Sequence, residues 1–166
     1  GVNNTGSHMF DLLRFFFGEI DWIESFFSKN VSRRKGDPNI DGFMRFKNGV
    51  FSSFQSCDVN EYLIFELNCF LQKGRIVLKD SGLKMEFYDV CESISSSEYK
   101  ELNKTKVPFS TNYKRNYLVN SVKHILECIR LGKNSTSSGE DGLNALKLIE
   151  ACIASANNNG KRIYLR

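Results

Sequence analysis

The sequence feature that most restricts the fold is Asn48-Gly49, which lies between two runs rich in phenylalanine, residues 43–47 and 50–55. Both central residues of a two-residue hairpin turn take positive φ, and Asn and Gly adopt that conformation most easily. The pair therefore predicts a β-hairpin. A hairpin fixes its two strands as antiparallel neighbours, so the chain is expected to build an antiparallel sheet around it.

Further strands are predicted on both sides of this hairpin, at residues 20–27, 62–71, 75–79, 83–88 and 161–165. Residues 62–71 alternate between one apolar and one mixed face, which is typical of a sheet covered on one side. Lys73-Gly74 and Asp80-Ser81-Gly82 are expected to turn the chain between short strands. Residues 92–112, rich in Ser, Lys, Glu and Thr, are predicted to form a long irregular connection.

Three helices are predicted from apolar spacing and end signals. The first covers residues 8–17, with Ser7 or Thr5 as its cap and Gly18 at its end. The second covers residues 113–131, and the third begins with a capping box, in which Ser137 or Ser138 precedes a carboxylate by three residues. The second helix carries an apolar stripe formed by Leu118, Val122, Ile125, Leu126 and Ile129.

These elements predict an α+β fold: a predominantly antiparallel open sheet with helices packed on one face. The other face is expected to carry aromatic side chains such as Phe70 and to be available for oligomerisation. The 166 residues are predicted to form one domain.

Composition narrows the possible functions. The net charge of +4 is small and the basic residues are scattered, so no nucleic-acid partner is expected, and an RNA-binding sheet is the weakest alternative. Five cysteines without a C-x-x-C pair and only two histidines provide no zinc ligand set and favour a reducing cytoplasm. The sequence shows no signal peptide, no apolar run long enough to cross a membrane, and neither G-x-G-x-x-G nor a P-loop.

The segment Asn4-Thr5-Gly6-Ser7-His8-Met9-Phe10-Asp11 holds the first candidate for acid–base chemistry. His8 and Asp11 stand at i and i+3 at the start of a helix, on neighbouring positions of one face. Gly-Ser-His-Met is also the remnant of a cleaved expression tag, but here five residues precede it and an amphipathic helix continues from it. A purely structural role for His8, as a cap or a packed ring, is the other alternative.

The same segment, Asn4-x-Gly6-Ser7-His8-x-x-Asp11 followed by Phe16-Phe17-Gly18, resembles the start of the C-terminal domain of the Gfo/Idh/MocA oxidoreductases. The far end agrees, because Ser138-Gly139-Glu140-Asp141-Gly142-Leu143 and the helix and strand that follow are similar to the end of that domain. The two matches bracket nearly the whole chain.

The resemblance implies that residues 1–166 form the substrate-binding and oligomerisation domain of a longer NAD- or NADP-dependent dehydrogenase, without its N-terminal Rossmann domain. The expected substrate is a sugar, cyclitol or nucleotide sugar, and the expected assembly is a dimer or tetramer formed through the sheet face. This chain alone is expected to be catalytically inactive.

By the same resemblance, His8 exchanges a proton with the substrate hydroxyl. Asn4 is assigned to substrate hydrogen bonding, and Asp11, on the substrate side with it, is expected to orient His8 or cap the turn rather than react. Tyr113, placed where the second helix is predicted to start, is a further candidate for substrate contact. The alternative from another class is a non-catalytic module that binds a protein partner through the open sheet face.

Overall fold

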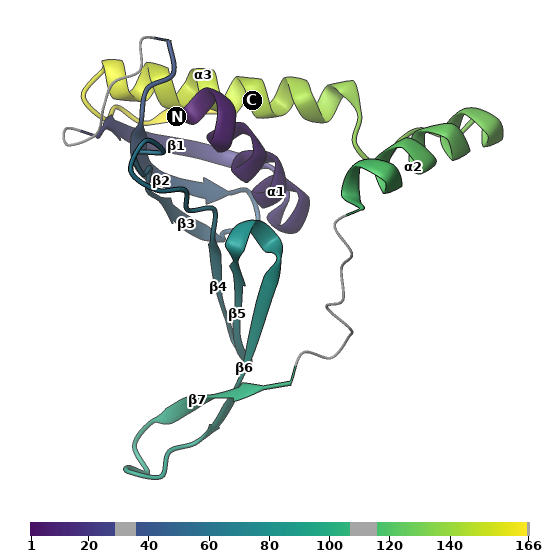
Figure 1. Ribbon diagram of the computed structural model, residues 1–166. Coiled ribbons are helices and arrows are strands. Elements are labelled where there is room, and N and C mark those ends of the chain that lie inside the picture. The colour runs from purple at the N-terminus through teal and green to yellow at the C-terminus, as the bar shows by residue number, and fades with distance from the viewer. Residues whose placement is uncertain (29–35, 107–115, 166) are drawn as a thin grey trace. The chain divides into compact units, whose positions relative to one another are not determined.

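The computed structural model describes residues 1–28, 36–106 and 116–165 (Figure 1), and the chain divides into two compact units. Unit 1 comprises Gly1–Leu63 and Arg130–Arg166, and unit 2 comprises Ile64–Ile129. Each unit contains one antiparallel sheet of four strands. The predicted α+β class is confirmed, although the strands form two sheets and not one continuous sheet.

The sheet of unit 1 is built around the predicted hairpin. Its strands are β1 (Ile20–Phe27), β2 (Ile40–Phe46), β3 (Phe51–Phe54) and β8 (Ile163–Tyr164), in the order β3-β2-β1-β8. Gly49 has a φ of 90°, and the Asn48 side chain accepts a hydrogen bond from the Val50 N–H at 3.1 Å. The hairpin is confirmed, but of the two turn residues Gly49 alone takes a positive φ, so the prediction that Asn48 does so as well is wrong.

Two helices, α1 (Ser7–Phe17) and α3 (Gly139–Asn157), cover the same face of this sheet (Figure 1). The core between them is apolar because alternate strand residues point toward the helices. The side chains that are fully or almost fully buried in unit 1 include Phe10, Leu13, Ile20, Ile23, Ile40, Met44, Phe46, Leu148 and Cys152. Burying a side chain of this size stabilises the fold by about 1.5–3 kcal/mol.

A buried polar contact joins α3 to β1. The Ser25 N–H donates to Ser155 Oγ at 2.9 Å, and Ser25 Oγ donates to the Cys152 carbonyl at 2.7 Å. Strand β8 pairs only with Trp22 and Ile23, so the backbone of Ser25 lies beyond its reach and Ser155 takes the place of a strand partner. Burial raises the pKa of the Cys152 thiol, which therefore stays protonated.

The start of α3 agrees with the prediction, whereas the start of α1 does not. Neither Ser7 nor Thr5 caps α1, because a π-helical turn (Val2–Gly6) leads directly into the helix and leaves no extended cap residue. Ser7 Oγ instead donates to the Asn4 carbonyl at 2.6 Å. In contrast, α3 begins with the predicted capping box between Ser138 and Asp141. Gly18 ends α1 as predicted, with a φ of 83°.

Unit 2 is a meander of β4 (Leu67–Leu71), β5 (Gly74–Lys79), β6 (Lys84–Glu92) and β7 (Lys100–Thr105), paired in chain order. The strand predicted at 62–71 is shorter than expected. The prediction of an irregular connection over residues 92–112 is wrong where β7 forms. The polar sequence of β7 lacks apolar alternation, but the segment is an edge strand. Such a strand has one neighbour and can expose both faces.

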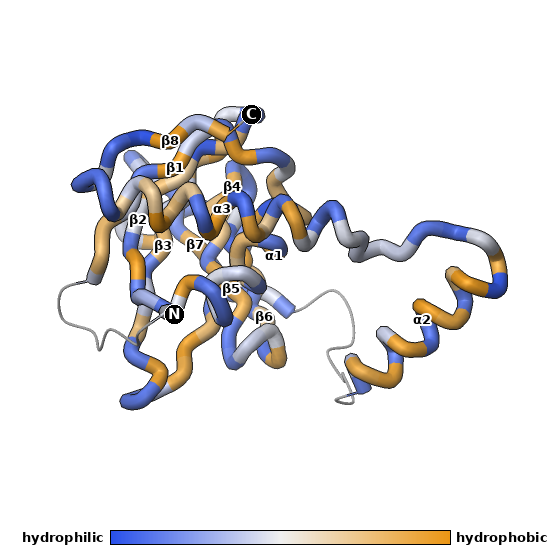
Figure 2. Tube along the Cα trace, turned by 90° about the horizontal axis from the view of Figure 1, so that it is seen from above, coloured by the Kyte–Doolittle hydropathy of each residue, from blue (hydrophilic) through white to orange (hydrophobic). Residues whose placement is uncertain are grey.

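Helix α2 (Tyr117–Leu131) carries the predicted apolar stripe, visible as orange segments along the helix in Figure 2. None of its residues is buried. The predicted start of this helix at Tyr113 lies outside the described residues. No helix within the described ranges combines the length and the apolar character that a membrane span requires.

Candidate functional site

His8 lies at the beginning of α1 and lines a hollow of about 380 Å³, called the His8 hollow below. The loop before α3 and the first turn of α3 form its other wall, so the hollow is contained within unit 1. Its lining residues are His8, Asp11, Leu12, Arg14, Phe15, Glu19, Thr136, Ser137 and Asp141. A volume of this size lies in the range of pockets that bind small molecules.

Arg14 connects the acidic residues of this hollow. Its guanidinium contacts Glu19 at 2.6 Å, and it lies 4.0 Å from a carboxylate oxygen of both Asp11 and Asp141. It also donates to the main-chain carbonyl of Asp141 at 3.5 Å. These contacts join α1 to the first turn of α3. Arg14 Nε is buried and has no hydrogen-bond partner among the described residues.

Asp141 is held from both sides. Ser138 donates to its carboxylate through the main-chain N–H at 2.8 Å and through Oγ at 2.7 Å. These two hydrogen bonds, together with the charge of Arg14, lower the pKa of Asp141. The carboxylate is therefore ionised throughout the neutral pH range. It contributes a negative charge to the wall of the hollow that α3 forms.

The structure brings together two of the four predicted site residues. His8 and Asp11 both line the hollow, one helical turn apart on α1. The side chain of His8 makes no hydrogen bond to another described residue, and the ion-pair partner of Asp11 is Arg14. Asn4 lies in the π-helical turn before α1, exposed and outside the lining of the hollow. Tyr113 lies outside the described residues.

Sequence reasoning missed the other polar residues of the hollow. Arg14 follows Asp11 by three residues and so continues the His8–Asp11 row along α1, a signal that was present but unused. In the sequence, Asp141 belongs to a capping box and to the motif of the family resemblance, and neither indicates a position in this hollow. Thr136 and Ser137 stand in a serine-rich loop, and nothing in their local sequence indicates a contact with residues about 130 positions earlier.

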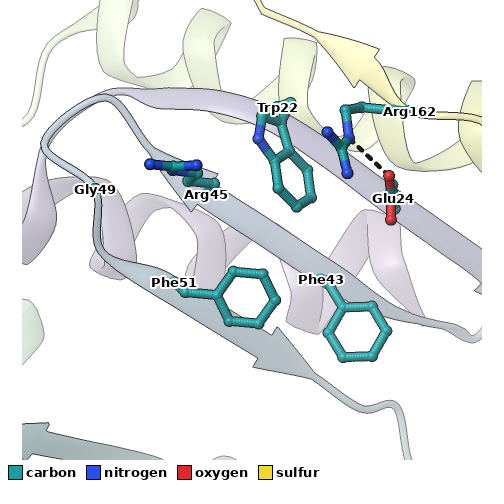
Figure 3. Close-up of a pocket in the computed structure, with 7 residues that line it drawn as sticks. All are labelled: Trp22, Glu24, Phe43, Arg45, Gly49, Phe51 and Arg162. Atoms are coloured by element: carbon teal, nitrogen blue, oxygen red, sulfur yellow. Dashed lines mark hydrogen bonds and ion pairs between the residues drawn. The ribbon is translucent and has the colours of Figure 1, made fainter.

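A second hollow, of about 520 Å³, lies on the sheet face of unit 1 that the helices leave open, and is called the sheet-face hollow below (Figure 3). It is lined by Trp22, Glu24, Phe43, Arg45, Gly49, Phe51 and Arg162. Figure 3 shows the three aromatic rings side by side across neighbouring strands. Phe51 stacks on Phe43 with ring centroids 5.9 Å apart and meets the edge of Trp22 at 6.1 Å.

Charged groups at one end of the sheet-face hollow are arranged around Trp22. The Arg162 guanidinium lies 3.9 Å from the centre of the Trp22 ring, and its Nε contacts Glu24 at 2.7 Å (Figure 3). Such an arrangement combines a cation–π contact with an ion pair. Arg45, on β2, is exposed beside it and forms no ion pair within the described part of the chain.

Neither hollow has the features of a metal or dinucleotide site. Within residues 1–28, 36–106 and 116–165, no group of three His, Cys, Asp or Glu side chains could hold a metal ion. A dinucleotide cradle needs a strand, a glycine-rich turn and a helix that returns to a parallel strand. Every described strand pair is antiparallel, and Glu140 and Asp141 occupy the first turn of α3, where a phosphate would be repelled.

The model of the oxidoreductase family, C-terminal alpha/beta domain, matches residues 2–165 of this chain. The chain belongs to this family. The match covers the His8 segment, both sheets and α3, and it confirms the resemblance to the Gfo/Idh/MocA proteins at both ends of the sequence.

Several solved structures share the fold of this chain. The WlbA dehydrogenase from Bordetella pertussis, in complex with NADH and UDP-GlcNAcA, shares 17% identity over 99% of this chain, with a TM-score of 0.67. The aldose-aldose oxidoreductase from Caulobacter crescentus, complexed with glycerol, shares 16% sequence identity over 96% of this chain, with a TM-score of 0.68. A levoglucosan dehydrogenase in complex with NADH and levoglucosan shares 13% sequence identity over 98% of this chain, with a TM-score of 0.74.

At these identities the likeness shows the fold. This chain spans less than half the length of the three proteins, covering 44%, 46% and 49% of their respective chains. No curated protein sequence matches it. Membership of the family therefore rests on the family model, which matches residues 2–165.

Proposed function

We propose that this chain supplies the substrate-binding and proton-transfer half of an NAD(P)-dependent oxidoreductase that acts on a hydroxyl group of a sugar-like molecule. The single observation that carries this proposal is the position of His8 in a hollow of about 380 Å³ with polar walls, in a chain that belongs to an oxidoreductase family. Solved relatives bound to NADH, UDP-GlcNAcA or levoglucosan support the cofactor and the substrate class.

The proposed role of His8 follows from the chemistry of alcohol oxidation. When a secondary alcohol becomes a ketone, the hydroxyl proton and the hydrogen on carbon leave separately, and an imidazole is suited to take the proton near neutral pH. His8 is exposed and makes no hydrogen bond to another described residue, so both ring nitrogens are available to a substrate. Asp11 borders the same hollow and is proposed to accept a hydrogen bond from a neighbouring substrate hydroxyl.

The nicotinamide nucleotide, which supplies hydride chemistry when bound, is proposed to be held by a separate domain. The antiparallel strand pairs and acidic start of α3 do not form a cradle for a pyrophosphate. The chain also spans less than half of each of the three solved relatives described above. We therefore propose that this chain alone is catalytically inactive. Saturable NAD(H) binding to it in titration calorimetry would contradict that statement.

Replacing His8 tests the proton-transfer role in a protein that joins this chain to a nucleotide-binding domain. His8→Ala is expected to lower kcat by about 10²–10⁴-fold, the usual contribution of a positioned acid–base group. Turnover is measured by the absorbance of NAD(P)H across a panel of sugars and cyclitols. His124→Ala is the matched control, because it removes the other histidine, which lies on α2.

The two substitutions separate the proposal from its alternatives. Unchanged turnover in His8→Ala would remove His8 from proton transfer and favour a structural role for the ring. An equal loss in His124→Ala would indicate that either change disturbs the fold rather than the reaction.

We also propose that the open sheet face of unit 1 binds a second copy of this chain. The sheet-face hollow presents Phe43 and Phe51, which are exposed, and charges of both signs on the same face. An aromatic patch bordered by charged residues is typical of protein interfaces. A self-complementary patch of this kind suits a symmetric dimer.

A further inference from the structure

We propose that the His8 hollow selects an uncharged polyhydroxy ring over the corresponding sugar acid. This inference rests on the proposed function, in which His8 faces the reacting hydroxyl. It concerns the charge of the substrate, which neither the family nor the fold determines. Its basis is the distribution of acidic and basic groups in the lining of the hollow.

The carboxylates of the hollow are accessible, whereas its guanidinium is not. The side chains of Asp11, Glu19 and Asp141 are 47%, 57% and 38% exposed, while that of Arg14 is only 8% exposed. Arg14 is the only lysine or arginine among the described residues that line the hollow. A molecule entering the hollow therefore meets three carboxylates, and the single cation lies beneath them with Glu19 already against it at 2.6 Å.

This arrangement remains acidic across the neutral range. Asp141 is kept ionised by the two hydrogen bonds from Ser138, which lower its pKa. Four charged side chains line the hollow: the carboxylates of Asp11, Glu19 and Asp141, and Arg14. The carboxylates exceed the guanidinium by two charges, so a carboxylate on the ligand would be repelled.

Neutral hydroxyl groups suit the same lining. A carboxylate accepts hydrogen bonds and donates none, so each of the three carboxylates can accept a hydrogen bond from a hydroxyl group of a sugar ring. The hydroxyl groups of Thr136 and Ser137, on the opposite wall, can both donate and accept. The residues that repel an acid are thus the residues that would hold a neutral ring.

The test is a ligand titration of this chain, followed by ¹⁵N NMR of the amides around Asp11 and Ser137 at pH 7 and low salt. D-glucose and D-glucuronate are the probes, because they share a ring and differ in one hydroxymethyl or carboxylate group. Glucose is expected to cause saturable shifts, and glucuronate to bind at least about tenfold more weakly, a ratio equivalent to about 1.4 kcal/mol.

Charge-neutralising variants locate the effect. Asp11→Asn and Glu19→Gln are each expected to reduce the glucose-to-glucuronate ratio by about threefold or more, since each removes one of the accessible carboxylates. Glu150→Gln is the matched control: it makes the same charge change at an exposed position of α3 that does not line the hollow, and should leave the ratio unchanged.

Three results would overturn the inference. The first is equal or tighter binding of glucuronate. The second is a glucose-to-glucuronate ratio that Glu150→Gln lowers as much as Glu19→Gln does. The third is the absence of amide shifts in the hollow with either sugar. None of them bears on proton transfer, which is measured by turnover in His8→Ala. Loss of the proposed proton-transfer role would conversely leave the binding ratio intact, so the two failures can be told apart.

Discussion

The hydroxyl group of Ser155, between α3 and the sheet of unit 1, contributes to the stability of the fold. Its side chain is fully buried and accepts the Ser25 N–H that β8 is too short to reach. Ser155→Ala leaves this N–H buried without a partner, which is expected to lower the free energy of unfolding by about 1–3 kcal/mol. Urea unfolding of the chain, followed by circular dichroism, measures the change.

Ser53→Ala is the control for this substitution. Ser53 lies exposed on β3, so the same loss of a hydroxyl should change the free energy of unfolding by no more than about 0.5 kcal/mol. Similar midpoints for the two variants would show that Ser155 contributes no more than a surface serine.

The candidate site could be predicted from the sequence only along one helix. His8 and Asp11 are three residues apart, and a helical repeat places them on one wall of the hollow whatever the rest of the chain does. Asn4 failed to join them because the turn before α1 is π-helical and follows a different repeat. Asp141 meets Arg14 because α1 packs beside α3, a tertiary contact that local spacing does not encode, whereas Glu19 contacts Arg14 from five residues further along the chain.

At the scale of elements, apolar alternation and turn residues were sufficient wherever one face of a strand is buried. Strand β1 and the hairpin of β2 and β3 were predicted on this basis, and so was the capping box of α3. Strand β7 differs from the prediction because its sequence, Lys100–Thr105, has Leu102 as its single apolar residue and so shows no apolar alternation. The information that makes it a strand lies in its partner β6, with which it pairs from Phe87 to Glu92.

Glu86 links three strands of unit 2 and gives that sheet a dependence on pH. Its carboxylate on β6 contacts Lys104 of β7 at 2.7 Å and Lys79 of β5 at 3.0 Å, and it accepts a hydrogen bond from Tyr88. The hydrogen bonds from Lys104, Lys79 and Tyr88 lower the pKa of Glu86 from 4.5 to about 2. Because the folded form has the lower pKa, its contribution to stability is complete above about pH 4.5 and is lost between that pH and about 2.

Amide hydrogen exchange of β7 tests this dependence. Protection of β7, corrected for the intrinsic effect of pH, is expected to fall between pH 4.5 and 2, and Glu86→Gln should abolish that fall by removing the titrating group. Glu92→Gln is the control, because the pair of Glu92 with Lys100 is largely exposed and contributes little. A pH profile that persists in Glu86→Gln would assign the effect to another group.

At the scale of the whole molecule, the face of unit 1 opposite its helices has the composition of an interface. Phe51, on the edge strand β3, is 59% exposed, although its ring contacts those of Trp22 and Phe43 on the same face. Water-exposed aromatic area of this kind is removed from solvent when two sheets pack face to face. A stable dimer buries about 800 Å² on each partner, so the proposed interface extends beyond the sheet-face hollow onto the surrounding sheet face.

Phe51→Ser is therefore expected to weaken self-association at least tenfold, since exposed aromatic side chains are frequent anchors of protein interfaces and Phe51 contacts both other rings of the row. Sedimentation velocity over a range of concentrations should show the wild-type chain at a multiple of 19.0 kDa and the variant shifted toward that mass. Ile94→Ser, a change of similar character at a fully exposed residue of unit 2, should leave the distribution unchanged. If the wild-type chain sediments as a 19.0 kDa monomer at high concentration, the sheet face does not bind a second copy.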